Sequence, residues 1–269
     1  MTNNNGLNNK AVYDLIDRQL AVWQQAKDNY EALSGVGVKE LVVEGFPVKV
    51  QFNPARIVSS AAKVDPKTIK ARKCFLCGAN RPAIQEGIPF YGKKCEYSVL
   101  INPFPIFPKH LTIPDVGHVN QTIEGEYERY EDMLTLSEVL DEFLFFYNGP
   151  KCGASAPDHM HFQGGNKGFL PVEYNYNALE KTLIVEGEGV KVFAVENYMR
   201  GIMAIEATDK LAAVAAECIP LMNSLISEIL QVCRQGVPFF QFISVLIIDN
   251  TGGKIGNGLT LSILGHQRQ

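Results

Sequence analysis

The chain has 269 residues, of which 46% are hydrophobic and 20% charged, and its formal net charge is −4. This composition excludes a disordered chain, and the length suffices for one large domain or for two halves that share a core. The acidic balance excludes a globally basic surface of the kind that binds nucleic acid.

The sequence contains neither a targeting signal nor a membrane helix that we can recognise. The first thirty residues lack a basic start and an apolar core, and no later window approaches the ~18 consecutive apolar residues of a membrane helix. We therefore expect a cytoplasmic protein without a membrane partner. Six cysteines, two of them three positions apart, fit a metal site better than a disulfide framework.

The N-terminal part of the chain predicts one helix and two short strands. Apolar residues recur at helical spacing over 7–33 and the pattern ends at Ser34-Gly35, so we expect an amphipathic helix docked on the body. Residues 41–43 and 48–52 predict strands joined through Gly45 and Pro47. A loop-rich region, 53–93, follows. It contains a basic run for which a solvated loop is the simplest interpretation: Lys63, Lys67, Lys70, Arg72 and Lys73.

From residue 95 the pattern becomes regular and then repeats. We predict strands over 95–102 and 110–113, a long helix over about 126–147 that ends at Asn148-Gly149, and a strand over 159–163. Strands over 190–195 and 202–205, a helix over 208–235 and a strand over 240–248 give a similar order. The sequence therefore predicts a duplicated strand-strand-helix-strand unit, and only the first copy contains histidines.

The predicted strand at 159–163 places His159, His161 and Gln163 on one face and Met160 and Phe162 on the other, because side chains alternate along a strand. The apolar pair is expected in the core. The three polar side chains, about 6 to 7 Å apart from one to the next, could hold a metal, a phosphate or both. A half-exposed edge strand with two incidental histidines is the alternative.

Cys74-Phe-Leu-Cys77 adds a second indication of a metal site, because two thiolates at this spacing can hold one side of a tetrahedral zinc. Two further ligands are required, and His110 with one of the strand histidines could supply them. A redox pair is the alternative, but the sequence that follows does not predict the helix start that would activate a thiol.

Four separated stretches, in this order along the chain, resemble the transferase branch of the histidine-triad superfamily. This group includes galactose-1-phosphate uridylyltransferase, diadenosine tetraphosphate phosphorylase and the GDP-hexose phosphorylases. The stretches are Phe52-Asn-Pro-Ala-Arg56, Lys73-Cys-Phe-Leu-Cys-Gly-Ala-Asn-Arg81, Ile101-Asn-Pro-Phe-Pro105 leading to Pro108-Lys-His110-Leu-Thr-Ile-Pro114, and Asn148-Gly-Pro-Lys-Cys-Gly-Ala-Ser-Ala-Pro-Asp-His159-Met-His161-Phe-Gln163.

The resemblance implies an α+β fold with an antiparallel, histidine-triad-like sheet and long helices. We expect an N-terminal helix over 1–35, a catalytic half with the zinc site over 36–165, and a second half without the histidine motif over 166–269. The resemblance also implies that His161 is the nucleophile, that Gln163 donates to the phosphate, and that a structural zinc is bound by Cys74, Cys77, His110 and His159.

Four further residues are implied to contact substrate, each with a simpler alternative. Arg56 resembles a phosphate- or base-binding arginine, although an arginine in a loop is usually solvated. Asn102 resembles a nucleotide-contacting asparagine, although Asn-Pro also forms turns. Asn148 and Ser155 match the segment before the histidines, but Ser155 lies four residues before His159 where the relatives place it three before.

The expected activity is that of a nucleotidyltransferase or phosphorylase working through a nucleotidyl-histidine. Its donor would be a nucleotide sugar or a dinucleoside polyphosphate, its acceptor phosphate or a sugar phosphate, and a homodimer is implied by resemblance only. Two alternatives stay open, a hydrolase and a non-catalytic zinc-containing nucleotide-binding protein. Glutamine at 163, where the hydrolytic relatives have a third histidine, favours transfer.

Overall fold

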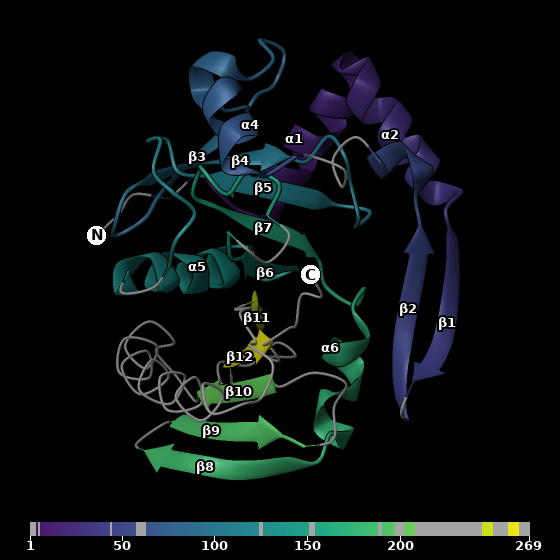
Figure 1. Ribbon diagram of the computed structural model, residues 1–269, viewed down its shortest axis with the longest axis vertical. Coiled ribbons are helices and arrows are strands. Elements are labelled where there is room, and N and C mark those ends of the chain that lie inside the picture. The colour runs from purple at the N-terminus through teal and green to yellow at the C-terminus, as the bar shows by residue number, and fades with distance from the viewer. Residues whose placement is uncertain are drawn as a thin grey trace.

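The computed structural model describes residues 4, 6–43, 45–57, 63–123, 126–150, 154–187, 190–196, 202–207, 244–249 and 258–263. The helix expected over 208–235 lies outside these ranges. Over the described part, the chain forms a ten-stranded antiparallel sheet, a separate two-stranded sheet and helices (Figure 1), which confirms the α+β class. No helix within the described ranges is long and apolar enough to cross a membrane.

The expected N-terminal helix is docked on the body, but it is two helices, α1 (Asn9–Val22) and α2 (Gln24–Ser34). The break falls at Trp23, whose backbone is extended (φ −105°, ψ 92°) and whose side chain is buried. Val12, Leu15 and Ile16 on α1 are buried in the same core as the first half of the sheet. The helical periodicity continues across Trp23, so the sequence pattern did not indicate that the helix is interrupted at this residue.

The two strands expected around Gly45 form a hairpin of β1 (Gly37–Val43) and β2 (Phe46–Phe52), with Gly45 at φ 87° in the turn. The hairpin lies beside the main sheet (Figure 1). Among the described residues of the loop-rich region after it are the short helical segments η1 (Pro54–Arg56), α4 (Pro66–Ala71) and η2 (Gly78–Asn80). Asp65 caps α4 by accepting the Thr68 N–H at 3.0 Å.

The first half of the large sheet contains five strands: β3 (Ile88–Tyr91), β4 (Glu96–Ile101), β5 (His110–Pro114), β6 (Phe143–Asn148) and β7 (His161–Asn166). Helix α5 spans Tyr127–Val139, so the helix expected over 126–147 is wrong beyond residue 139. Residues 143–148 instead form β6, between β7 and β11 in the middle of the sheet. A strand covered on both faces has a continuous apolar sequence, and periodicity cannot distinguish such a run from a buried helix.

In the described residues of the second half, α6 (Pro171–Asn175) and η3 (Tyr176–Ala178) precede five strands: β8 (Lys181–Gly187), β9 (Val190–Val195), β10 (Ile202–Ala207), β11 (Ser244–Asp249) and β12 (Gly258–Ile263). The sheet order is β3-β4-β5-β7-β6-β11-β12-β10-β9-β8. Read from either edge, each half has the same order, and the halves meet at the antiparallel pair β6 and β11. The duplication is confirmed, with more strands in each copy than the sequence indicated.

Candidate functional site

The histidine motif lies at the start of β7, in the first half of the sheet. The strand begins at His161, so His159 precedes it rather than lying in it as expected. Strand β7 pairs antiparallel with β5 on one side and with β6 on the other, and His161 lies opposite Pro114. Met160 and Phe162 are fully buried in the core, as the alternation predicted, whereas Gln163 is half-buried.

His161 is held in one tautomer. Its Nδ1 lies 2.8 Å from the His159 carbonyl oxygen, which can only accept, so the ring hydrogen is on Nδ1 and the lone pair is on Nε2. Burial lowers the pKa of His161 to about 4, so the ring is neutral at neutral pH. A neutral imidazole with a free Nε2 lone pair is the form in which histidine acts as a nucleophile.

The backbone of His161 is fixed by Gln121, which is almost fully buried. The Gln121 side chain accepts the His161 N–H at 2.7 Å and donates to the carbonyl oxygens of His161 (3.1 Å) and Asn148 (2.8 Å). One amide therefore connects the start of β7, at His161, to the end of β6. No local pattern indicates a role for Gln121, because its partners are backbone groups 27 and 40 residues away.

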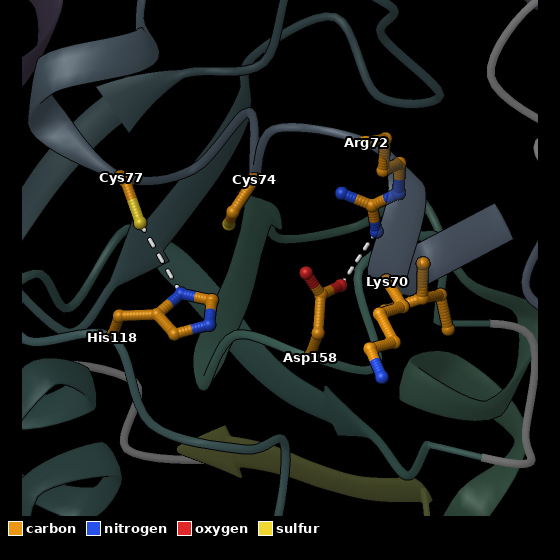
Figure 2. A pocket seen from close by; sticks show the side chains of 7 residues that line it. Lys70, Arg72, Cys74, Cys77, His118 and Asp158 are labelled. Carbon is orange, nitrogen blue, oxygen red and sulfur yellow. Dashed lines mark hydrogen bonds and ion pairs between the residues drawn. The ribbon is translucent and has the colours of Figure 1, made fainter. Parts of the chain in front are cut away.

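Cys74, Cys77, His118 and His159 bring one possible ligand atom each to within 4.8 Å of one another. The Cys77 Sγ lies 3.2 Å from His118 Nδ1 (Figure 2). The Cys74 Sγ lies 3.2 Å from His159 Nδ1. The His159 Nε2 lies 2.8 Å from the Asp115 carbonyl oxygen, so it bears the hydrogen and leaves Nδ1 free to bind a metal. Two thiolates and two imidazoles are a ligand set that suits zinc.

His118 therefore takes the position in this cluster that the sequence assigned to His110. Strand β5 runs antiparallel to β7, so residues just beyond its C-terminal end lie near His159, whereas His110 at its first position lies opposite Gly165. His110 is fully buried, and its ring bonds to the Ile106 N–H and to Gln163. Applying the antiparallel register to the two predicted strands would have favoured His118, which the resemblance did not assign to the metal site.

A buried ion pair lies behind the cluster. Arg129 donates to Asp115 Oδ2 at 2.7 Å, and the side chains of this pair are only 7% and 5% exposed. Arg129 also contacts the Tyr97 hydroxyl and the Cys95 thiol, each at 3.3 Å. Because the carbonyl of Asp115 accepts from His159, this ion pair fixes the residue that orients a candidate metal ligand.

A cavity of about 390 Å³ opens beside the cluster and is lined by Ile69, Lys70, Arg72, Cys74, Cys77, His118 and Asp158 (Figure 2). Lys70 and Arg72 belong to the basic run that the sequence left as a solvated loop. Arg72 pairs with Asp158 at 2.5 Å, and both side chains are largely buried, at 21% and 14% exposed. The end of the basic run is therefore attached to the segment that precedes His159.

The four residues expected to contact substrate lie in four different environments. Arg56 is half-buried and lies close enough to His110 to lower that histidine's pKa. Asn102 donates to Thr112 Oγ1 at 3.0 Å and accepts the Phe104 N–H at 2.9 Å, which is the arrangement of an Asn-Pro turn. Asn148 ends β6 beside the Gln121 amide. Ser155 is half-buried in the segment before His159.

The chain belongs to the family whose model is described as Domain of unknown function (DUF4922), which matches residues 15–166. That range contains the histidine motif, the cysteine pair and every residue of the candidate site. No curated protein sequence matches the chain.

The structure is similar to several solved structures of low sequence identity. Yeast Ap4A phosphorylase Apa2 in complex with AMP is 15% identical with a TM-score of 0.46, covering 92% of this chain and 80% of that one. A DUF4931 family protein from Bacillus cereus is 13% identical with a TM-score of 0.46, covering 68% and 87%. A uridylyltransferase mutant is 14% identical with a TM-score of 0.35, covering 70% and 78%.

Proposed function

We propose that this protein is a nucleotidyltransferase or phosphorylase that transfers a nucleoside monophosphate through a covalent bond to His161. The observation that carries this proposal is the state of His161, whose Nδ1–H is bound to the His159 carbonyl and whose ring is kept neutral by burial. A nucleophile needs an available lone pair at neutral pH, and this arrangement provides one at Nε2. The sequence resemblance of the motif to known transferases assigns the same role to His161.

The reaction would proceed in two displacements at the α-phosphorus. In the first, His161 Nε2 forms a bond to phosphorus and the bridging oxygen leaves with the rest of the donor, as a sugar phosphate from a nucleotide sugar or as a nucleoside polyphosphate from a dinucleoside polyphosphate. In the second, the oxygen of phosphate or of a sugar phosphate displaces His161 and restores the free ring. Splitting one displacement into two lets the same site serve donor and acceptor in turn.

Gln163 is proposed to donate its amide hydrogens to the phosphoryl oxygens, where negative charge develops. It lies two residues after His161 on the same strand and hence on the same face, about 6 to 7 Å away. An amide carries no titratable proton, so it stabilises charge without protonating a leaving alcohol or activating water. For this reason we propose transfer to phosphate or sugar phosphate rather than hydrolysis.

Cys74, Cys77, His118 and His159 would hold a zinc ion. Four protein ligands leave no coordination position for substrate, so this metal would be structural, fixing the segment that leads into β7. The donor set fits because both cysteine sulfurs and both Nδ1 atoms converge and the outer nitrogen of His159 is already bound to the Asp115 carbonyl. The protein part of the mechanism is then carried by His161 and Gln163.

The donor is proposed to be a nucleotide sugar or a dinucleoside polyphosphate. The test is a product screen in which purified protein is incubated with GDP-, UDP- and ADP-hexoses and with diadenosine tetraphosphate, each with and without phosphate. Release of a nucleoside diphosphate that requires phosphate and disappears in His161→Ala supports a phosphorylase. Release of the monophosphate without any acceptor would identify a hydrolase instead, and turnover by His161→Ala would exclude the nucleophile.

A further inference from the structure

His110 occupies a defined position that the metal site does not use. Its side chain is fully buried between Phe107, whose ring centroid lies 5.4 Å away, and Phe146, at 6.5 Å. Its backbone is held as well: the carbonyl oxygen accepts from the Tyr30 hydroxyl at 3.1 Å and from the Asn102 N–H at 2.8 Å. A residue restrained at both backbone and ring has one orientation.

The tautomer of His110 follows from its partners. The Ile106 N–H lies 3.1 Å from Nδ1 and can only donate, so Nδ1 is the acceptor and bears no hydrogen. The hydrogen of the neutral ring is therefore on Nε2, which lies 3.1 Å from Gln163 Oε1. Burial, together with the nearby charge of Arg56, lowers the pKa of His110 to about 3, so the ring does not gain a second proton at neutral pH.

This contact decides which end of the Gln163 amide is available. An amide has one oxygen and one nitrogen, and a donor at His110 Nε2 selects the oxygen as its partner. The nitrogen of Gln163, with two hydrogens, is then the end left for another group. Gln163 is half-buried, so part of its side chain is open on the face that it shares with His161.

We infer that His110 is a positioning residue that holds the Gln163 amide with its nitrogen, rather than its oxygen, towards the phosphate bound at His161. Without His110 the amide would rotate freely and present an oxygen, which repels a phosphoryl oxygen, about as often as a nitrogen. The inference rests on the proposed function and adds a residue to it. An amide that is already oriented stabilises developing negative charge without having to reorient during the reaction.

A limit on the donor follows from the same geometry. The hydrogen on His110 Nε2 is bound to Gln163, and the amide hydrogens of Gln163 are not acidic, so neither residue gives a proton to a departing oxygen. When the bond from the α-phosphorus to the bridging oxygen breaks, its electron pair stays on a group that must be stable as an anion. A phosphate or sugar phosphate meets this requirement at neutral pH and an alkoxide does not. This pair of residues therefore suits phosphoric anhydrides rather than alkyl phosphodiesters.

The first experiment needs no substrate and tests the hydrogen bond itself. In protein labelled with ¹⁵N in histidine, NMR spectra of the ring nitrogens should show His110 as a neutral ring with its hydrogen on Nε2 from pH 8 to pH 5. Gln163→Ala should shift that Nε2–H signal and leave the tautomer unchanged. A hydrogen on Nδ1, or a Nε2–H signal that does not respond to Gln163→Ala, would overturn the inference.

The second experiment measures the rate at which the His161 adduct forms with diadenosine tetraphosphate and with the nucleotide hexoses of the screen. His110→Phe keeps an aromatic ring but removes the donor, and His110→Gln retains one. We expect His110→Phe and Gln163→Ala to slow the adduct by a similar factor, on the order of 10² as for other single donors to developing charge. The double variant should be no slower than Gln163→Ala, and His110→Gln should recover most of the rate.

The two failures can be told apart. If the wild-type protein forms no adduct with any donor, the proposed function fails, while the NMR result still decides whether His110 orients Gln163. If the wild type reacts and His110→Phe reacts equally fast, or if the effects of His110→Phe and Gln163→Ala multiply, the positioning role is wrong. Near-ultraviolet circular dichroism of each variant checks that the fold is retained.

Discussion

Replacing Arg129 by Met should be one of the most destabilising changes in this chain, because it leaves the Asp115 carboxylate buried without its cation. The two side chains are 7% and 5% exposed, and Oδ2 of Asp115 would keep the uncharged Cys95 thiol, 3.1 Å away, in place of a cation. Removing one partner of a buried ion pair costs about 3–5 kcal/mol, more than the pair itself contributes. We therefore expect a loss of that size in the free energy of unfolding by urea.

The matched control is Arg18→Met. Arg18 pairs with Glu86 at 3.5 Å, but the two side chains are 55% and 56% exposed, and exposed pairs contribute about 0–1 kcal/mol. Both variants remove an arginine from an ion pair, so the difference between their losses of unfolding free energy measures the effect of burial. Arg129→Met should also weaken zinc binding, measured by competition with a chelator, because Asp115 orients His159. Equal unfolding free energies for the two variants would refute the reasoning.

Three further predictions concern the metal ligands, β7 and pH. His118→Gln should lose bound zinc, measured by atomic emission, whereas His110→Gln should retain it; loss of zinc from His110→Gln alone would reverse the assignment of ligands. Gly165→Ala should cost about 1–3 kcal/mol of unfolding free energy, because a Cβ there would lie within 3.0 Å of three ring atoms of Phe107, whereas Gly37→Ala meets nothing within 4 Å; similar costs would count against this packing. His110 has its pKa lowered from 6.5 to about 3, so the unfolded chain binds a proton that the folded chain does not, and stability falls as pH decreases through 6.5. Between pH 7 and pH 5 the wild type should lose about 2 kcal/mol more than His110→Gln, and parallel stability curves would show that His110 is not buried as a neutral ring.

The parts of the site that could be predicted from the sequence are those that depend on neighbouring residues. Strand alternation placed Met160 and Phe162 in the core and His161 and Gln163 together, and the spacing of Cys74 and Cys77 indicated a metal site. These inferences need only the geometry of one strand or one loop. They do not depend on how distant segments of the chain pair with one another.

The predictions that were wrong, and the site residues that were missed, depend on pairing between distant segments. His110 begins β5 and His118 follows its C-terminal end, and only the antiparallel register with β7 decides which one reaches His159. Residues 143–148 have the apolar sequence of a helix or of a central strand, and their place beside β11 decides for the strand. Gln121 and Arg129 have no local signal because their partners become neighbours only after folding.

The most direct test of the central claim is mass spectrometry of the protein quenched seconds after mixing with diadenosine tetraphosphate or a nucleotide hexose, without acceptor. We expect a nucleoside monophosphate on the peptide that contains His161, labile to acid and lost when phosphate is added. The same adduct on His161→Ala, or on any other residue of the wild type, would contradict it.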